Sequence, residues 1–155
     1  ESDFLRYVIG DLALMQGGDG TVAIRNSKCL SADVNAGIDP TFQDVMERRN
    51  ASRLNYGVVV TKYTGARGKS GTSDASAEYM ASVRKLLDEN GIIWQSGELG
   101  RVDLGGGGTV AQFIANMGVD VVDLGVPVLS MHAPFETTAK LDIYMCHRAM
   151  YEFMK

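Results

Sequence analysis

Tyr56-Gly-Val-Val-Val-Thr-Lys-Tyr63 is the segment that decides the fold class. Its run of β-branched residues predicts a buried strand. Further apolar segments on both sides of it predict strands over residues 27–34, 92–95, 119–126 and 127–132. Helical periodicity predicts helices over 4–15, from a cap at Asp74 to Asn90, over 109–117 and from about 138 onward. Strands that alternate with helices predict one α/β domain of three layers over residues 1–155.

Composition limits the classes of function. The 155 residues are 45% hydrophobic and 22% charged, with a formal net charge of −4. A weakly acidic chain argues against a nucleic-acid partner. No apolar run approaches the roughly 18 residues that cross a bilayer, and no export signal is visible, so we expect no membrane contact and a cytoplasmic location. Cys29 and Cys146 lie outside any CxxC motif and are expected to be buried thiols.

Two residues at predicted strand ends are candidate metal ligands. Asp33 closes the strand over 27–34, and His132 follows the apolar segment Val128-Leu-Ser-Met131. Open α/β sheets place ligand sites at such strand ends, and carboxylate oxygen and imidazole nitrogen both bind zinc. The alternatives are a loop or capping Asp and a hydrogen-bonded core His. We read His147, in the last helix, as a surface or packing residue.

Glycine-rich segments offer a second, different function. Gly105–Gly108 precedes a predicted helix and suggests an anion- or nucleotide-binding module that uses backbone N–H groups. It matches neither GxGxxG nor GxxxxGK[ST]. Residues 65–71 contain Gly-Lys-Ser, but Thr64 stands where a phosphate loop needs its first glycine. Lys62, Arg67 and Lys69 give this loop a positive charge that attracts a carboxylate or is simply solvated.

A set of ordered motifs resembles the aspartyl aminopeptidase / aminopeptidase I family of dinuclear zinc exopeptidases, in its bacterial branch. The most specific motif is Asp123-Leu-Gly-Val-Pro-Val-Leu-Ser-Met-His132. The others are Ser31-Ala-Asp33 with a following Asp39-Pro40, then Gly57-Val-Val-Val-Thr-Lys62, then Gly107-Gly-Thr-Val110. The resemblance runs from about Asn26 to the C-terminus, and it implies the zinc-peptidase-like (phosphorylase/hydrolase-like) fold, with a mixed sheet flanked by helices.

The resemblance also implies roles for single residues. Asp33 would bind one zinc and His132 the other, while Lys62, Lys69 and Gly107 would contact a peptide substrate. The complete enzyme would hydrolyse N-terminal residues with two zinc ions, for which cobalt or manganese are possible substitutes. The general-base Glu, the other ligands and the small inserted domain have no counterpart here, so we expect a C-terminal part of the catalytic domain that is inactive alone. Family members assemble into dodecamers, which implies a homo-oligomer.

Two positions depart from the family pattern. Ala36 replaces a histidine three places after the zinc Asp, and Ala133-Pro-Phe-Glu136 replaces Ser-Ile-Arg-Glu after the zinc His. Both changes lie at the rim of the expected substrate pocket. The preferred N-terminal residue and the native metal therefore do not follow from the sequence.

Overall fold

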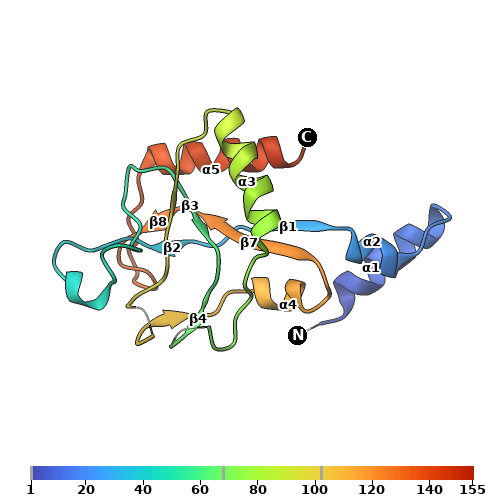
Figure 1. Cartoon of the computed structure of the whole chain (residues 1–155), viewed down its shortest axis with the longest axis horizontal. Helices are drawn as coiled ribbons and strands as arrows, with labels where there is room; N and C mark the ends of the chain where they lie inside the picture. The colour runs from blue at the N-terminus through green and yellow to red at the C-terminus, as the bar shows by residue number, and fades with distance from the viewer. Residues whose placement is uncertain (1, 68, 102) are drawn as a thin grey trace.

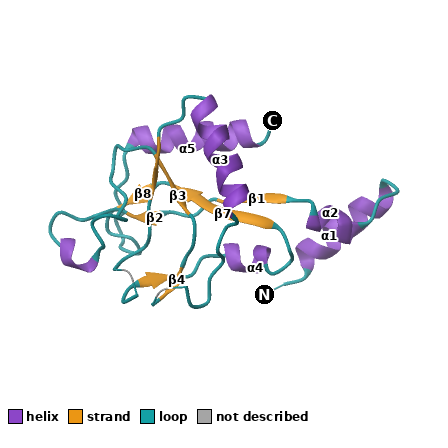
Figure 2. Ribbon diagram, in the orientation of Figure 1, coloured by secondary structure: helices purple, strands orange, loops and turns teal. Residues whose placement is uncertain are grey.

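The computed structural model describes residues 2–67, 69–101 and 103–155 and contains a mixed four-stranded sheet (Figures 1 and 2). The middle pair, β7 and β3, is antiparallel, whereas each edge strand runs parallel to its neighbour. The strand order is β1 (Lys28–Ser31), β7 (Asp120–Gly125), β3 (Val58–Thr61) and β5 (Trp94–Ser96). The mixed sheet predicted by the resemblance is therefore confirmed.

One face of the sheet forms the hydrophobic core with two helices. Alternate residues of β3 and β7 point toward α3 (Ala77–Glu89) and α5 (Lys140–Phe153), which lie together on this face (Figure 1). Leu87 of α3 and Ala149 of α5 are completely buried against them. Because strand side chains alternate between faces, the remaining residues of the same strands point the other way. The residues that fill this core are Val58, Val60, Val122, Leu124, Ala75, Tyr79, Val83, Leu87, Ile92, Met145 and Ala149.

The opposite face carries smaller elements. The short helix α4 (Ala111–Ala115) packs on β7, and Ala111 is fully buried there. A two-stranded ribbon of β4 (Gly65–Ala66) and β6 (Gly106–Gly107) lies on the same side as α4 (Figure 2). Helices on both faces of one sheet confirm the three-layer α/β/α architecture.

A buried carboxylate joins the start of β3 to α5. Asp142 is fully buried in the first turn of α5. Its two oxygens accept hydrogen bonds from the backbone N–H groups of Asn55 and Gly57, each at 2.8 Å. The amphipathic pattern of this helix placed Ile143 and Tyr144 on its apolar side, but both are exposed.

The first two helices project from the end of β1. α1 (Phe4–Met15) packs against α2 (Gly20–Arg25), which the sequence did not predict. The amphipathic pattern of α1 predicted a buried face, yet none of its residues is buried; Phe4 is 72% exposed and Met15 is 83% exposed. Of the helices in the described residues, none is long and apolar enough to span a bilayer.

Several element boundaries differ from the sequence prediction. Ser76, not Asp74, caps α3 by accepting a hydrogen bond from the N–H of Tyr79 at 3.1 Å. The predicted strand 127–132 shrinks to β8 (Pro127–Val128), and β8 pairs in parallel with β2 (Asn35–Ala36). A short 3₁₀ helix, η1 (Gln43–Val45), falls in a segment for which the sequence predicted no element. The β2–β8 pairing joins segments that are distant in sequence, so a local apolar pattern does not predict it.

Candidate metal centre and substrate loop

Asp33 lies between two short ladders that share one register. Ser31 of β1 is opposite Asp123, and Asn35 of β2 is opposite Pro127, so Asp33 falls opposite Gly125. The two backbone segments are in direct contact there, because a Cβ added to Gly125 would lie 1.7 Å from the carbonyl oxygen of Asp33. Asp33 therefore occupies a fixed place at the carboxyl ends of β1 and β7, where open α/β sheets bind ligands.

His132 lies in the loop that follows β8. This loop is closed at its base by two backbone hydrogen bonds between Leu129 and Thr137, of 2.9 and 3.1 Å. Ser130 and His132 both adopt left-handed backbone conformations, with φ of 59° and 68°. The His132 side chain is exposed. The structure thus brings the chain segments of Asp33 and His132 to the same pair of neighbouring strands, while a shared metal site for their side chains stays a prediction.

A buried polar network links the Asp33 segment to β3. The Asn35 amide donates to the hydroxyl of Thr61 at 3.1 Å and accepts from the hydroxyl of Ser52 at 2.6 Å. All three residues are buried, so these hydrogen bonds are shielded from competition with water. Since Lys62 follows Thr61 directly, the network fixes the start of the expected substrate loop relative to Asp33.

The structure brings the two expected substrate lysines together through an acidic residue. The carboxylate of Asp74 accepts a hydrogen bond from Lys62 on one oxygen and from Lys69 on the other. These hydrogen bonds hold the pKa of Asp74 below its usual range, and the bond to Asp74 raises the pKa of Lys69. One of the two lysine charges is therefore neutralised within the cluster. Gly68, inside the predicted basic loop, lies outside the described residues.

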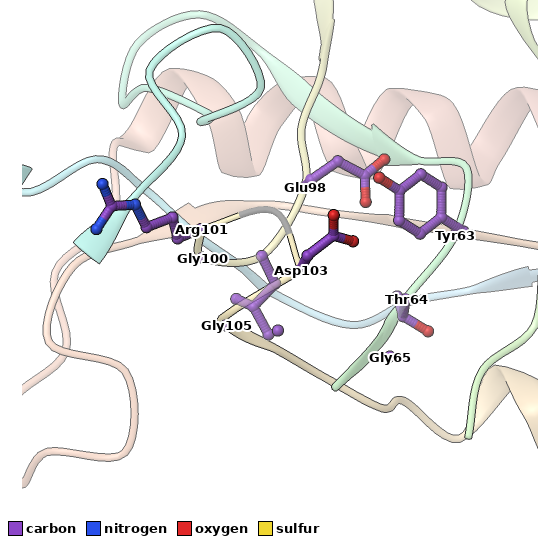
Figure 3. A pocket seen from close by; sticks show the side chains of 10 residues that line it. Tyr63, Thr64, Gly65, Glu98, Gly100, Arg101, Asp103 and Gly105 are labelled. Atoms are coloured by element: carbon purple, nitrogen blue, oxygen red, sulfur yellow. The ribbon is translucent and has the colours of Figure 1, made fainter. Parts of the chain in front are cut away.

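A small pocket opens beside this cluster (Figure 3). Figure 3 shows the carboxylate of Glu98 directed toward the hydroxyl of Tyr63, with the carboxylate of Asp103 turned toward the same space. Burial raises the pKa of Glu98 to about 7, although the nearby Lys69 opposes the shift. Glu98 was not predicted from the sequence; it follows the carboxyl end of β5 by two residues, as Asp33 follows that of β1.

Asp123 carries a second buried carboxylate near Asp33. One of its oxygens accepts a hydrogen bond from the Thr109 hydroxyl at 3.0 Å, and within the described residues the other has no partner that meets hydrogen-bond geometry. Burial raises the pKa of Asp123 and the charge of Asp33 adds to the rise, while the nearby Ser31 hydroxyl lowers it. Asp123 thus ties the loop that contains Gly107 to the strand beside Asp33.

The Gly105–Gly108 run is explained by close packing of backbone. Gly106 and Gly107 form β6 rather than a turn at a helix start, and α4 begins only at Ala111. A Cβ on Gly106, whose φ is +101°, would lie 2.0 Å from the carbonyl oxygen of Gly65. Such an approach requires glycine. The arrangement lacks the helix N-terminus on which the nucleotide-binding alternative depended.

The candidate metal ligands, Asp33 and His132, are of the types that bind zinc, but two are fewer than a catalytic zinc needs. Asp33 uses one carboxylate oxygen to accept a hydrogen bond from the N–H of Val34 at 2.8 Å, which orients the other oxygen. Carboxylate oxygen and imidazole nitrogen are both zinc ligands, but a catalytic zinc takes three protein ligands. Across residues 2–67, 69–101 and 103–155, no group of three or more His, Cys, Asp and Glu side chains is placed to hold a metal.

Comparison with known proteins identifies the family. Residues 1–154 match the family described as aminopeptidase I zinc metalloprotease (M18). This chain belongs to the M18 family. It is 45% identical over 148 residues to a probable M18 family aminopeptidase 1 of Clostridium acetobutylicum, covering 93% of this chain and 32% of that protein. A Thermotoga maritima protein of the same description is 49% identical over 132 residues, covering 83% and 29%.

Solved structures agree with this M18 assignment. The crystal structure of an M18 aminopeptidase from Thermotoga maritima is 42% identical and matches with a TM-score of 0.95, covering 100% of this chain and 36% of that one. Aminopeptidase I from C. acetobutylicum is 44% identical and matches with a TM-score of 0.91, covering 100% of this chain and 34% of that one. A structure described as the S. cerevisiae mApe1 dodecamer shares the fold at 24% identity and a TM-score of 0.69, covering 86% and 28%. The chain spans about a third of the length of the relatives that it matches.

Proposed function

We propose that the complete protein removes N-terminal residues from peptides at a two-zinc site to which this chain contributes Asp33 and His132. The observation that carries the proposal is the register shared by the β1–β7 and β2–β8 pairs, which puts Asp33 beside Gly125. Gly125 ends β7, and the chain continues from there through β8 into the loop that contains His132. The M18 assignment supplies the chemistry. Zinc, when bound, polarises the scissile carbonyl and makes a bound water acidic near neutral pH.

The residues of this chain would then hold the metal ions and orient the peptide substrate. Asp33 offers a carboxylate oxygen and His132 an imidazole nitrogen as metal ligands. Lys62, Lys69 and the backbone of Gly107 would contact the peptide, with Asp74 fixing where both lysine amino groups lie. The general-base Glu and the remaining ligands would come from outside these 155 residues, as would the inserted small domain, so we expect this C-terminal part of the catalytic domain to be inactive by itself.

A chimera tests the proposal in a complete context. The chain replaces the matching 148-residue segment of the C. acetobutylicum relative, and hydrolysis of leucine- and aspartate-linked chromogenic substrates is measured with Zn²⁺ or Co²⁺. We expect turnover that a chelator abolishes. We expect Asp33→Ala and His132→Ala each to lower kcat/KM by about 100-fold or more, because loss of metal-based stabilisation costs several kcal/mol.

A matched control separates ligand loss from general damage. Glu89→Ala removes an exposed carboxylate on α3, far from the proposed site in the fold, and should leave kcat/KM unchanged. Full turnover by the Asp33→Ala and His132→Ala chimeras would refute the assignment of these two ligands. Robust turnover by the 155-residue chain alone would refute the claim that the site needs residues from elsewhere.

We also propose that the complete protein is a cytoplasmic homo-oligomer. The structure of mApe1 described as a dodecamer and the exposed apolar side chains of α1 support assembly. Cys29 and Cys146 are both free thiols, which suits a reducing compartment. Burial raises the pKa of each, so neither is activated as a nucleophile. Light scattering on the complete protein measures the assembly directly.

A further inference from the structure

We propose that Glu136 is a positioning residue for His132: its carboxylate holds the histidine backbone in the left-handed conformation that presents the imidazole to the metal. The observation is a hydrogen bond from the backbone N–H of His132 to Oε1 of Glu136, of 2.7 Å. This inference rests on the proposed role of His132 as a ligand.

The loop around His132 shows why such a residue is needed. Non-glycine residues rarely adopt positive φ, and here Ser130 and His132 both do so within three residues. Strained backbone of this kind persists only where surrounding contacts enforce it, and it gathers at functional sites. The strain therefore requires specific bonds that hold the loop.

Most of these bonds hold the base of the loop, not its tip. Leu129 and Thr137 exchange two backbone hydrogen bonds, and the Thr138 hydroxyl donates to the carbonyl of Pro127 at 2.9 Å. A bond from the N–H of Ala133 to the carbonyl of Ser130, of 2.9 Å, closes a four-residue turn in which His132 is the third residue, a position where some turn types need a positive φ. Glu136 supplies the bond that acts on His132 itself. A hydrogen bond to a charged acceptor is stronger than a neutral one, which suits this task.

The arrangement leaves the imidazole free. Glu136 acts on the backbone N–H of His132, and the exposed side chain is not used by this contact. The carboxylate therefore sets the direction of the Cα–Cβ bond without occupying a ring nitrogen. Partners that orient a metal ligand in this way typically contribute 10- to 100-fold to metal affinity or activity.

The test compares two substitutions at one position. Glu136→Ala removes the acceptor, whereas Glu136→Gln keeps a side-chain oxygen at the same reach without the charge. Glu89→Ala is the control for loss of an exposed carboxylate elsewhere. Backbone geometry is read in the 155-residue chain by NMR, from the intraresidue amide–Hα cross-peak of His132, which is strong at positive φ, and from the exchange rate of its amide proton. Metal affinity is read in the chimera by titration with Co²⁺.

We expect Glu136→Ala to weaken the cross-peak, to speed His132 amide exchange about tenfold or more, and to lower Co²⁺ affinity by about 10- to 100-fold. Glu136→Gln should recover most of each change, and Glu89→Ala should cause none. An unchanged cross-peak and exchange rate in Glu136→Ala would overturn the proposal, as would changed geometry with undiminished affinity. If His132→Ala itself leaves Co²⁺ affinity intact, the ligand assignment fails instead, which the NMR readout distinguishes. Should Glu136→Ala not fold, the same NMR comparison on Glu136→Gln decides. The neutral oxygen is a weaker acceptor, so His132 amide exchange should be measurably faster than in the original chain, and an unchanged exchange rate and cross-peak would overturn the proposal.

Discussion

Gly125→Ala is the substitution that most directly tests how Asp33 is placed. The added Cβ would lie 1.7 Å from the carbonyl oxygen of Asp33 and 2.6 Å from its carbonyl carbon. Ordinary contacts begin near 3.4 Å, so the two backbones must separate by more than 1 Å. Overpacking of this kind costs about 1–3 kcal/mol when side chains can yield. Here both contacts are to backbone, and we expect a loss of about 3 kcal/mol in the free energy of unfolding.

The same displacement should affect catalysis beyond its effect on stability. A misplacement of about 1 Å can cost roughly 100-fold in rate. Urea unfolding of the 155-residue chain measures the first effect, and kcat/KM of the chimera, at a temperature where it stays folded, measures the second.

Gly10→Ala is the matched control for Gly125→Ala. Gly10 lies inside α1, and a Cβ there meets no atom within 4 Å. Alanine should stabilise a helix interior by about 0.5–1 kcal/mol relative to glycine, a change of opposite sign. If the free energy of unfolding of Gly125→Ala lies within about 0.5 kcal/mol of that of the original chain, the backbone of Asp33 does not pack against Gly125 as described.

Two further predictions concern buried carboxylates. Asp142→Ala should lower the free energy of unfolding by about 3 kcal/mol or more, since it leaves two buried backbone N–H groups without a partner; urea unfolding measures this, and a loss below 1 kcal/mol would contradict the role assigned to Asp142. Glu98 has a pKa raised to about 7, so the folded state binds a proton more tightly than the unfolded state. Stability should therefore fall as the pH rises from about 4.5 through 7, by roughly 1 kcal/mol once partial solvent exposure is allowed for. Glu98→Gln should remove this slope in unfolding experiments at pH 5 and pH 8, and an unchanged slope would assign it to another group.

The strands could be predicted where local composition decides them. The β-branched run at 58–61 and the apolar run at 120–125 are buried strands as expected. α1 was predicted to the residue, but its environment was not, because a periodic pattern does not show whether a partner covers the apolar face. In α5 the burial of Asp142 was not predicted, because the two backbone N–H groups that it binds lie 85 and 87 positions away.

In the candidate site, too, features set by local sequence were predicted, whereas features set by distant contacts were not. Asp33 and His132 were selected because they end predicted apolar strands; the structure places Asp33 two residues after β1 and His132 four residues after β8, in a loop. The binding of both Lys62 and Lys69 to Asp74 was not predicted, because Asp74 was assigned to a helix cap. Glu98 was missed because its raised pKa arises from burial by segments that only the fold brings together. Strain in the His132 loop likewise has no signature in residue type, since Ser130 and His132 are not glycines.

The order of strands has a consequence for how the protein folds. In this sheet β1 is an edge strand, and its partner β7 lies almost ninety residues later in the chain, whereas only β4 and α3 lie between β3 and β5. Contacts that close such long loops form late and slow folding. During synthesis, β1 therefore lacks its β7 pairing partner until residues 120–123 have been made. A chain stopped before residue 120 would leave the β7 side of β1 open to pairing with other molecules.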